Sequence, residues 1–214
     1  GNFQENRFLI DIIKNKKATH VLDVGCATGT TYRYLSNKFT SKEYKYKGFD
    51  ISQAAINNAK LLYRGNIFYK FTENIYQNLP EIDKEIVYSR DTVMHQEEPL
   101  KFLEDLINIT SKFLILRLRT RDEGETEWDF NISTQMHYDK YWMPYIVINI
   151  EELTNFILKI RKPKSIKINR SYKVLGGHNY RVLPRDLYFK KAGGAETSIC
   201  IEFSNEMNNN TEIN

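Results

Sequence analysis

The sequence predicts an α/β fold in which a mostly parallel sheet carries helices on both faces. Short apolar runs typical of buried strands alternate with longer amphipathic segments typical of helices, from residue 3 to residue 120. The chain has 214 residues, 41% of them hydrophobic and 27% charged, which suits one domain with a substantial core. Regular alternation of this kind favours parallel strands that are joined by crossover helices.

Each expected element has its own local signal. The first helix is expected from Phe3 to Asn15, where apolar residues recur at helical spacing. Ser52 precedes another amphipathic stretch and is expected to cap its N-terminus. The remaining helices are expected over residues 30–39, 52–64, 98–110 and 150–160. The strands that alternate with them are expected over residues 20–25, 44–51, 66–72, 84–91 and 113–120.

The alternation stops after the fifth expected strand. Residues 121–149 contain both tryptophans and show no clear period, so we interpret them as an insertion. Late strands are expected over residues 164–174, 185–192 and 197–203, the last two joined by a turn at the two adjacent glycines that follow residue 192. We expect a single domain over residues 1–205, followed by a polar tail at residues 206–214.

A glycine-containing loop follows the first expected strand, in the stretch VLDVGCATGTTYRYL. Open α/β sheets bind ligands at the carboxyl ends of their strands, and Gly25 and Gly29 permit tight turning and close approach there. A dinucleotide site needs the spacing G-x-G-x-x-G, but Ala27 and Thr30 stand where that pattern requires glycine. A nicotinamide-dependent dehydrogenase therefore fits this loop poorly.

The loop resembles motif I, D-x-G-x-G-x-G, of the class I S-adenosylmethionine-dependent methyltransferases. The motif stands here as Asp23-x-Gly25-x-Ala27-x-Gly29, with alanine in place of the middle glycine. The resemblance covers about residues 18–120 and implies a Rossmann-like, mostly parallel seven-stranded sheet with antiparallel late strands. It also implies S-adenosylmethionine as cofactor and S-adenosylhomocysteine as product. In that family the loop wraps the amino-acid end of the cofactor, and Asp23 would help to hold its amino group directly or through water.

Further cofactor-binding candidates follow the next strands. Asp50, in GFDIS, stands at the expected end of the second strand, where a carboxylate can accept both ribose hydroxyls and where the family has an acidic residue. Ile51 follows it and belongs to the same candidate site. The segment FTEN matches the place where the family contacts adenine, and its candidates are Thr72, Glu73 and Asn74. The segment YSRDTVMHQ resembles the family segment that lies beneath the sulfonium, and its candidates are Ser89 and Arg90.

Methyl transfer to oxygen or nitrogen also needs a base that removes a proton from the acceptor. His95 follows the fourth expected strand and is our first candidate, the alternative being a histidine that packs at the start of the next helix. His178, in LGGHNY, and His137, in MHYDKYW, are further candidates, although an ordinary surface or structural role is favoured for both. His20 precedes the first strand, at the wrong edge of the sheet. Asp91 could shape the site with its neighbour Arg90, or form a local ion pair with it.

The insertion at residues 121–149 lies where small-molecule methyltransferases carry a substrate cap. Its aromatic residues could stack on a sugar ring or a planar acceptor, or form the core of a lid; they are Trp128, Phe130, Tyr138, Tyr141, Trp142 and Tyr145. Residues 135–153 resemble segments of methyltransferases from bacterial surface-polysaccharide loci. This resemblance makes a small molecule, with a sugar or polysaccharide precursor as one candidate, the expected acceptor.

Several other functions are less well supported. The segment KIRKPKSIKINR is basic, but no RNA-binding motif accompanies it and the formal net charge of +4 is modest, so RNA is a less favoured acceptor. A non-catalytic binding module is a further alternative, although the cofactor loop is intact apart from Ala27. The acidic residues at 122, 123, 125, 127 and 129 match no metal-ligand spacing, so we expect an exposed acidic loop and no metal.

Cysteine usage and hydropathy bear on the cellular compartment. Cys26 and Cys200 are too few for a disulfide framework or a zinc site, which favours a reducing, cytoplasmic compartment. No apolar run approaches the roughly 18 residues that a membrane span needs. Cys26 lies within the cofactor loop, and we interpret it as a small filler rather than a nucleophile because nothing nearby would lower its pKa. The oligomeric state is unknown from the sequence.

Overall fold

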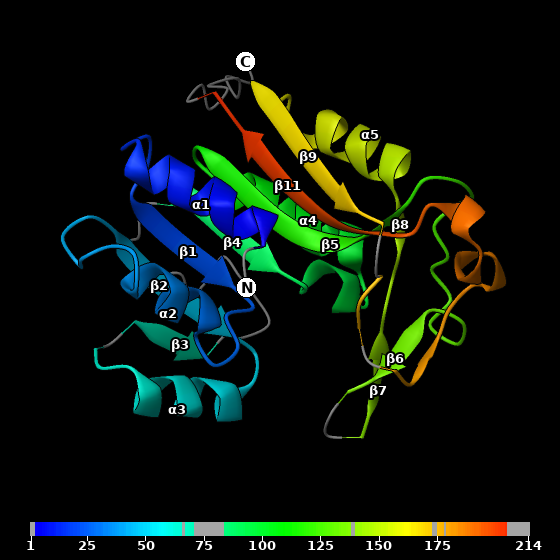
Figure 1. Cartoon of the computed structure of the whole chain (residues 1–214), viewed down its shortest axis with the longest axis horizontal. Coiled ribbons are helices and arrows are strands. Elements are labelled where there is room, and N and C mark those ends of the chain that lie inside the picture. Colours follow the sequence, from blue (N-terminus) through cyan, green and yellow to red (C-terminus); the bar gives the residue numbers. More distant parts are fainter. Residues whose placement is uncertain are drawn as a thin grey trace, which may run out of the picture.

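The computed structural model describes residues 3–65, 67–70, 84–137, 140–172, 175–177 and 179–204 (Figure 1). Its α-helices are α1 Gln4–Lys14, α2 Thr30–Ser36, α3 Gln53–Leu62, α4 Pro99–Ile109 and α5 Ile150–Ile160. The described residues also form the short 3-10 helices η1 Val93–His95, η2 Arg185–Tyr188 and η3 Lys190–Ala192. The first five strands are β1 His20–Val24, β2 Lys45–Asp50, β3 Phe68–Lys70, β4 Ile86–Arg90 and β5 Phe113–Arg121. The later strands are β6 Thr134–Met136, β7 Trp142–Pro144, β8 Ile148–Asn149, β9 Ser165–Ser171, β10 Arg181–Val182 and β11 Ala195–Glu202.

The main sheet has the strand order β3-β2-β1-β4-β5-β11-β9, and the two-residue strand β8 also pairs with β5. The strands from β3 to β5 are parallel to one another. Strand β11 is antiparallel to both of its neighbours, β5 and β9. The predicted fold class is therefore confirmed: a mostly parallel sheet that reverses direction near its late edge.

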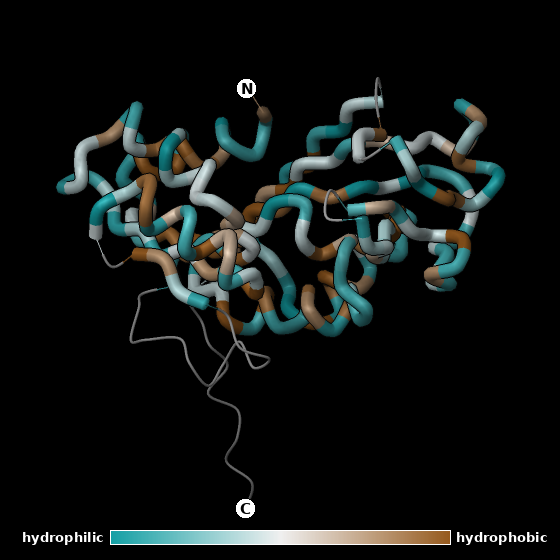
Figure 2. Tube along the Cα trace, turned by 90° about the horizontal axis from the view of Figure 1, so that it is seen from below, coloured by the Kyte–Doolittle hydropathy of each residue, from teal (hydrophilic) through white to brown (hydrophobic). Residues whose placement is uncertain are grey.

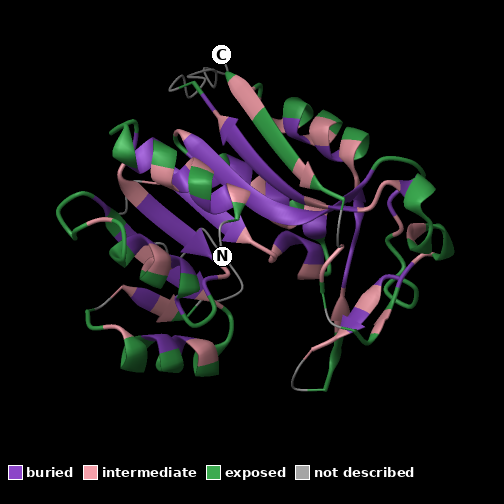
Figure 3. Ribbon diagram, in the orientation of Figure 1, coloured by how far each residue is buried: buried purple, intermediate pink, exposed green. Residues whose placement is uncertain are grey.

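Helices cover both faces of this sheet, as Figure 1 shows. Alternate residues of each central strand contribute to two apolar clusters, one of which contains Val21 and Ile115 and the other Leu22 and Leu114. The first cluster is completed by α1, α2 and α3, and the second by α4 and α5. In Figure 3 the central strands are almost wholly buried, whereas the helices are buried along one stripe only. Figure 2 shows the corresponding alternation of hydrophilic and hydrophobic residues along the helices.

Local capping explains where two of the helices begin. The side chain of Ser52 accepts a hydrogen bond of 3.2 Å from the backbone N–H of Ala55, which confirms the predicted cap of α3. At α5, the side chain of Asn149 accepts from the N–H groups of Glu151 and Glu152 at 2.8 and 3.2 Å. These caps satisfy backbone donors that would otherwise lack partners in the first helical turn.

The insertion forms part of a second, smaller sheet with the antiparallel order β10-β6-β7, which lies beyond the carboxyl end of β5 (Figure 1). A third apolar cluster supports it, made of the buried residues Met94, Tyr145, Val147 and Leu183 with Leu175 and Leu187 packed against them. Because Met94 belongs to η1 and Leu187 to η2, this cluster joins the insertion both to the segment after β4 and to the late part of the chain.

The strand expected over residues 185–192 is absent, so that prediction is wrong. The segment folds into η2 and η3, in which Leu187 donates to the carbonyl of Pro184 and Phe189 donates to that of Asp186. The carbonyl of Ala192 accepts the N–H groups of Asp122 and Glu123, the two residues that follow β5. The two glycines at 193 and 194 consequently lead from η3 into β11 and do not join two strands.

Two expectations lie partly outside the described residues. The polar tail at residues 206–214 falls there entirely, and the division into one domain over residues 1–205 stays a prediction.

Among the helices that the structure describes, none combines the length and the apolar character that crossing a bilayer requires.

Candidate active site

The glycine loop after β1 is held against the end of β2. The N–H groups of Gly25 and Cys26 both donate to the carbonyl of Phe49, at 2.8 and 3.0 Å. Gly25 has φ +83°, and a Cβ built there would lie 2.0 Å from the hydroxyl oxygen of Thr92. Gly29 has φ +82°, and a Cβ there would lie 2.7 Å from the ring of Phe68. Both positions therefore require glycine for their backbone conformation and for the closeness of their neighbours.

Ala27, which replaces the middle glycine of the motif, also has a left-handed backbone with φ +46°. This conformation is costly for a residue with a Cβ, so it must be stabilised by its surroundings. The carboxylate of Asp50 supplies that support, because its Oδ2 accepts the N–H of Ala27 at 2.8 Å. The alanine therefore leaves the shape of the loop intact.

Asp50 stands at the carboxyl end of β2, where the sequence placed it. Its Oδ1 accepts the N–H of Ser52 at 2.8 Å, while its Oδ2 accepts that of Ala27. Each carboxylate oxygen can accept more than one hydrogen bond, so this fixed carboxylate can still accept two hydroxyl donors. Ile51 beside it is 74% exposed, which leaves an apolar side chain available to cover a ligand.

Asp23 lies beneath the loop and is only 1% exposed. Its Oδ2 accepts a hydrogen bond of 2.6 Å from the hydroxyl of Tyr46 on the neighbouring strand. Burial raises the pKa of Asp23 to about 6, against the opposing effect of hydrogen bonds from Tyr46 and Thr31. Because the carboxyl group is buried, contact with the cofactor through water is favoured over direct contact.

Cys26 and Ser89 have structural contacts. Cys26 is buried, a Cβ at Gly48 would lie 2.9 Å from its sulfur, and burial raises the pKa of its thiol well above the usual range. A thiol with a raised pKa is a poor nucleophile at neutral pH. Ser89 is also buried, and its hydroxyl donates to the carbonyl of Val24 at 3.0 Å, which ties β4 to the end of β1.

Beyond the cofactor loop, arginine side chains surround Asp91. Its carboxylate lies 2.7 Å from Nη1 of Arg119, 3.3 Å from Nη1 of Arg117 and 3.7 Å from Nε of Arg90. Asp91 also has a left-handed backbone, with φ +55°. The local ion pair between Arg90 and Asp91 thus exists, but the two arginines of β5 make the shorter contacts.

Two further carboxylates complete this charged network. Glu196 on β11 lies 2.8 Å from Nη2 of Arg117 and 3.1 Å from Nη2 of Arg119. Glu5 on α1 is 1% exposed and lies 3.6 Å from Arg90 and 3.8 Å from Arg117. The network therefore connects α1, β4, β5 and β11, four elements that are distant from one another in the sequence.

The N-terminal turn of the chain covers this network. The ring of Phe3 lies 4.5 Å from the guanidinium carbon of Arg90 and 4.6 Å from that of Arg117, both distances within the range of cation–π contacts. Phe3 is 36% exposed, so it lies over the arginines instead of entering the apolar core.

His95 lies at the end of η1, between β4 and the insertion. Its Nδ1 is 2.7 Å from the carbonyl oxygen of Pro144. A carbonyl can only accept, so Nδ1 carries the proton and Nε2 keeps a free lone pair. Burial is the main cause that lowers the pKa of His95 below 6.5, and its neutral form therefore prevails at neutral pH.

Groups from three other segments lie close enough to His95 to influence its pKa, namely Asp91, Arg119 and His137. The ring of His137 stacks on that of Tyr141 at 4.6 Å, at the end of the β6–β7 hairpin. The structure thus brings two of the three candidate histidines to one region.

Tyr145 connects this region to the glycine loop at residues 175–177. Its side chain is fully buried, 6.0 Å from the ring of His95, and its hydroxyl lies 2.7 Å from the carbonyl oxygen of Gly176. A Cβ at Gly176 would lie 2.6 Å from Nη2 of Arg119, and one at Gly177 would lie 2.6 Å from the ring of Tyr145. Close packing of this loop against the arginine network therefore depends on both glycines.

Several predicted residues lie outside the described residues: His178, Thr72, Glu73 and Asn74, and the cap residue Tyr138. The other cap aromatics have different environments. Tyr145 belongs to a buried cluster. The other four are 38–52% exposed, and they are Trp128, Phe130, Tyr141 and Trp142. Within the described part of the chain, no group of three or more histidine, cysteine, aspartate or glutamate side chains is arranged to hold a metal ion.

Sequence reasoning missed Arg117, Arg119 and Glu196. A signal for the arginines was available, because residues 117, 119 and 121 alternate along a strand and therefore share one face. Three buried arginines in a row require acidic partners. The sequence did not indicate which acids would meet them, since those acids come from α1, the residue after β4, η2 and β11.

Comparison with known proteins agrees with the fold. The family described as "Methyltransferase domain" matches residues 15–161, more than half of the chain, so this chain belongs to that family. The sequence is also 25% identical over 97 residues to the phosphoethanolamine N-methyltransferase of Plasmodium falciparum (isolate 3D7). That match covers 44% of this chain and 35% of the relative, so the chain spans about a third of the length of the curated relative it matches.

Two similar solved structures share the fold along nearly the whole chain. Magnesium protoporphyrin IX methyltransferase of Synechocystis PCC 6803, solved with S-adenosylmethionine bound, is 16% identical with a TM-score of 0.53, over 94% of this chain and 79% of that one. The N-terminal domain of EvdMO1, solved in the presence of S-adenosylhomocysteine and D-fucose, is 11% identical with a TM-score of 0.63. The match covers 95% of this chain and 85% of that one. The chain thus belongs by family to the class I S-adenosylmethionine-dependent methyltransferases, and S-adenosylmethionine is the cofactor of that class.

The residues present fit this cofactor. The backbone at Gly25 and Gly29 leaves no room for side chains, and the carboxylate of Asp50 is fixed where it can accept ribose hydroxyls. Ile51 offers an exposed apolar side chain beside that carboxylate.

Proposed function

We propose that this protein transfers the methyl group of S-adenosylmethionine to an oxygen or nitrogen atom of a small molecule, with a sugar or surface-polysaccharide precursor as the candidate acceptor. The proposal rests above all on His95, whose Nδ1 faces the carbonyl of Pro144 and whose Nε2 keeps its lone pair. That geometry would allow His95 to act as a neutral base, in the same region as Asp91, Arg119 and His137.

The residues of this chain would act as follows. The loop at residues 25–29, with Asp50, would hold the cofactor, and Asp23 would favour its amino group from beneath the loop. When bound, the cofactor supplies a methyl group that is activated by a positively charged sulfur. His95 would accept the proton that the acceptor atom loses, at Nε2, while Pro144 fixes the orientation of its ring.

The choice of acceptor class has separate support. The insertion presents exposed aromatic side chains, including Trp128, Tyr141 and Trp142, which suit the apolar face of a sugar ring. One similar solved structure was determined in the presence of D-fucose, and one relative is named as an N-methyltransferase, so both sugar and nitrogen acceptors are reasonable to test. RNA remains the less favoured acceptor. A cytoplasmic location remains a prediction, supported by the two free thiols, Cys26 and Cys200.

Replacing His95 by alanine tests the proposal. We expect the single-turnover rate of methyl transfer to fall by about 10²–10⁴-fold, the usual contribution of a general base. The affinity for S-adenosylhomocysteine should stay within about twofold, because His95 is not part of the glycine loop. Labelled cofactor with a panel of sugars, amines and RNA supplies the assay.

His20→Ala is the matched control, because His20 lies at the opposite end of β1 and contacts Glu85. This variant should keep the full rate. Full activity of the His95 variant would remove His95 as the base. Retained cofactor binding without transfer to any acceptor in wild-type protein would favour the non-catalytic alternative.

A further inference from the structure

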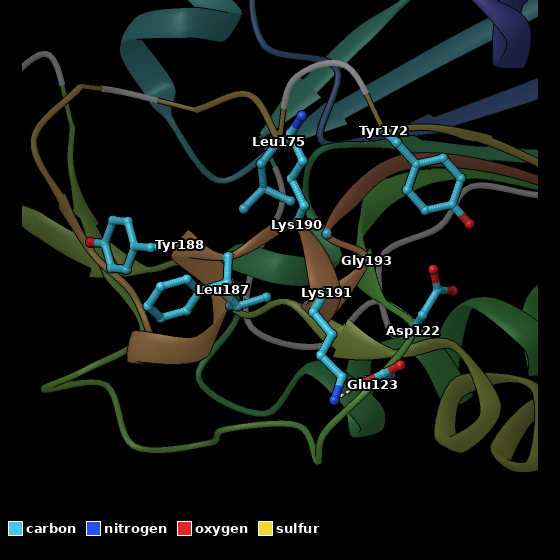
Figure 4. Close-up of a pocket in the computed structure, with 11 residues that line it drawn as sticks. Asp122, Glu123, Tyr172, Leu175, Leu187, Tyr188, Lys190, Lys191 and Gly193 are labelled. Carbon is cyan, nitrogen blue, oxygen red and sulfur yellow. Dashed lines mark ion pairs between the residues drawn. The ribbon is translucent and has the colours of Figure 1, made fainter.

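A second concave site opens beside the candidate active site, with a volume of about 680 Å³. This volume is in the range of small-molecule binding pockets. The residues that directly follow β5 and β9 contribute Asp122 and Tyr172. The segment of η2 and η3 contributes Tyr188, Lys190 and Lys191. Figure 4 shows these side chains around one pocket.

The pocket presents aromatic rings to solvent. Tyr172, Tyr188 and Phe189 all line it and are 56%, 62% and 61% exposed. In Figure 4, Tyr172 and Tyr188 lie on opposite sides, with Lys190 between them. The ring of Tyr172 is fixed by Arg170, whose Nη1 donates to the tyrosine hydroxyl at 2.9 Å. Exposed rings on a fixed scaffold are suited to stacking on the flat face of a ligand ring.

The charges in the pocket favour an anion. Asp122 forms an ion pair with Arg170, and Glu123 lies 3.9 Å from Nζ of Lys191. Each of the two carboxylates thus has a cationic partner. Among the described residues, Lys190 has neither an ion-pair partner nor a hydrogen-bond partner for its ammonium group. One lysine thus remains to meet a negatively charged group on a ligand.

The floor of the pocket connects it to the candidate active site. Leu175 and Leu187 line the pocket and also pack against the buried cluster that contains Met94 and Tyr145. Met94 directly precedes His95, and the hydroxyl of Tyr145 lies 3.0 Å from the carbonyl oxygen of Leu175. A ligand in the pocket would therefore lie against the same layer of side chains that supports His95.

We propose that this pocket binds the part of the acceptor that carries a ring and a phosphate group, as in a sugar phosphate or a nucleotide. The ring would stack on Tyr188 and Phe189, and the phosphate would pair with Lys190. This inference rests on the proposed function for the role of the ligand as acceptor, but the binding itself can be measured without catalysis.

Calorimetric titration of the full chain with four probes tests the binding. We expect UDP or glucose 1-phosphate to bind at least tenfold more tightly than inorganic phosphate, because only these probes add a ring. Tighter binding of UDP would indicate that the pocket takes a nucleotide, and tighter binding of glucose 1-phosphate that it takes a sugar phosphate. A single-stranded RNA oligonucleotide is the fourth probe, and binding of RNA alone would overturn the proposal.

Substitutions at exposed positions locate the bound probe. Tyr188→Ala and Lys190→Ala should each weaken its binding by about tenfold, through lost stacking and lost charge pairing. Tyr188→Phe, which keeps the ring, should retain the affinity within about twofold. Lys42→Ala removes the same charge from an exposed loop before β2 and should change nothing.

Two results would contradict the proposal: binding of neither ring-bearing probe above the level of phosphate, or unchanged affinity in both alanine variants. The affinity for S-adenosylhomocysteine is measured on every variant and should not change. If wild-type protein does not bind S-adenosylhomocysteine, the result counts against the proposed function. If it binds S-adenosylhomocysteine but neither UDP nor glucose 1-phosphate, the result counts against the proposed role of this pocket alone.

Discussion

The environment of Asp23 opposes the charged form of its carboxyl group. Its pKa is raised from 3.8 to about 6 because it is buried. The folded protein therefore binds the proton more tightly than the unfolded chain does between these two values. As pH rises from about 4 to about 6, the free energy of unfolding should fall, by up to about 3 kcal/mol.

Replacement of Asp23 by asparagine tests this dependence. Asparagine cannot ionise but can still accept the hydrogen bond from Tyr46, so the variant should lose this part of the pH dependence. We expect the variant to gain stability relative to the wild type as pH rises from 4 to 7, measured by urea unfolding. A difference that is constant over this range would show that Asp23 titrates normally.

Burial shifts the pKa of His95 in the opposite direction from that of Asp23, because the charged form of histidine is the protonated one. Burial lowers its pKa below 6.5, so the neutral form that can accept a proton persists to lower pH than in free imidazole. The rate of methyl transfer should therefore fall to half of its plateau value only below pH 6.5. A rate that already declines between pH 8 and pH 7 would contradict this account.

Asp50 combines two tasks, since it shapes the loop through Ala27 and Ser52 and is the candidate acceptor of ribose hydroxyls. Asp50→Ala should weaken S-adenosylhomocysteine binding by about tenfold or more, because hydrogen bonds to a charged group contribute about 1.5–3 kcal/mol each. Glu43→Ala is the control, since Glu43 accepts from the backbone N–H of Thr40 in a loop before β2. Unchanged affinity of the Asp50 variant in calorimetry would remove the ribose assignment.

At the level of elements, the glycine loop needs a left-handed backbone at Gly25, Ala27 and Gly29, but only the two glycines lack room for a Cβ. Gly25→Ala should lower the free energy of unfolding by about 2 kcal/mol or more, because the new Cβ would meet Thr92 and the positive φ would be strained. Ala27→Gly should change stability by less than about 1 kcal/mol, since relief of strain is offset by greater freedom in the unfolded chain. Thermal unfolding that ranks the two variants in the reverse order would contradict the described loop.

The elements with strong local signals could be predicted from the sequence. Ser52 identifies the start of α3, and the apolar runs identify β1, β4 and β5, because capping and periodicity are local properties. Residues 185–192 were misassigned as a strand because apolar and aromatic residues there resemble a strand pattern. The ion pair of Asp186 with Arg121, and the bonds from the end of β5 to Ala192, come from distant residues and decide the local fold.

For the molecule as a whole, the mostly parallel sheet with helices on both faces followed from the alternation, and the glycine motif indicated the cofactor. The charged network was not predictable, because Glu5, Asp91 and Glu196 converge on β5 from three separate parts of the chain. The second sheet was missed for the same reason: β10 has only two residues and pairs with β6, which lies far earlier in the sequence.

The central claim is that the loop around Gly25 and Gly29, together with Asp50, holds S-adenosylmethionine. Calorimetric titration of the wild-type chain with S-adenosylhomocysteine, with NAD as the control ligand, tests it most directly. The account predicts micromolar binding of S-adenosylhomocysteine and no binding of NAD. Absence of binding by S-adenosylhomocysteine, or equal binding of NAD, would contradict it.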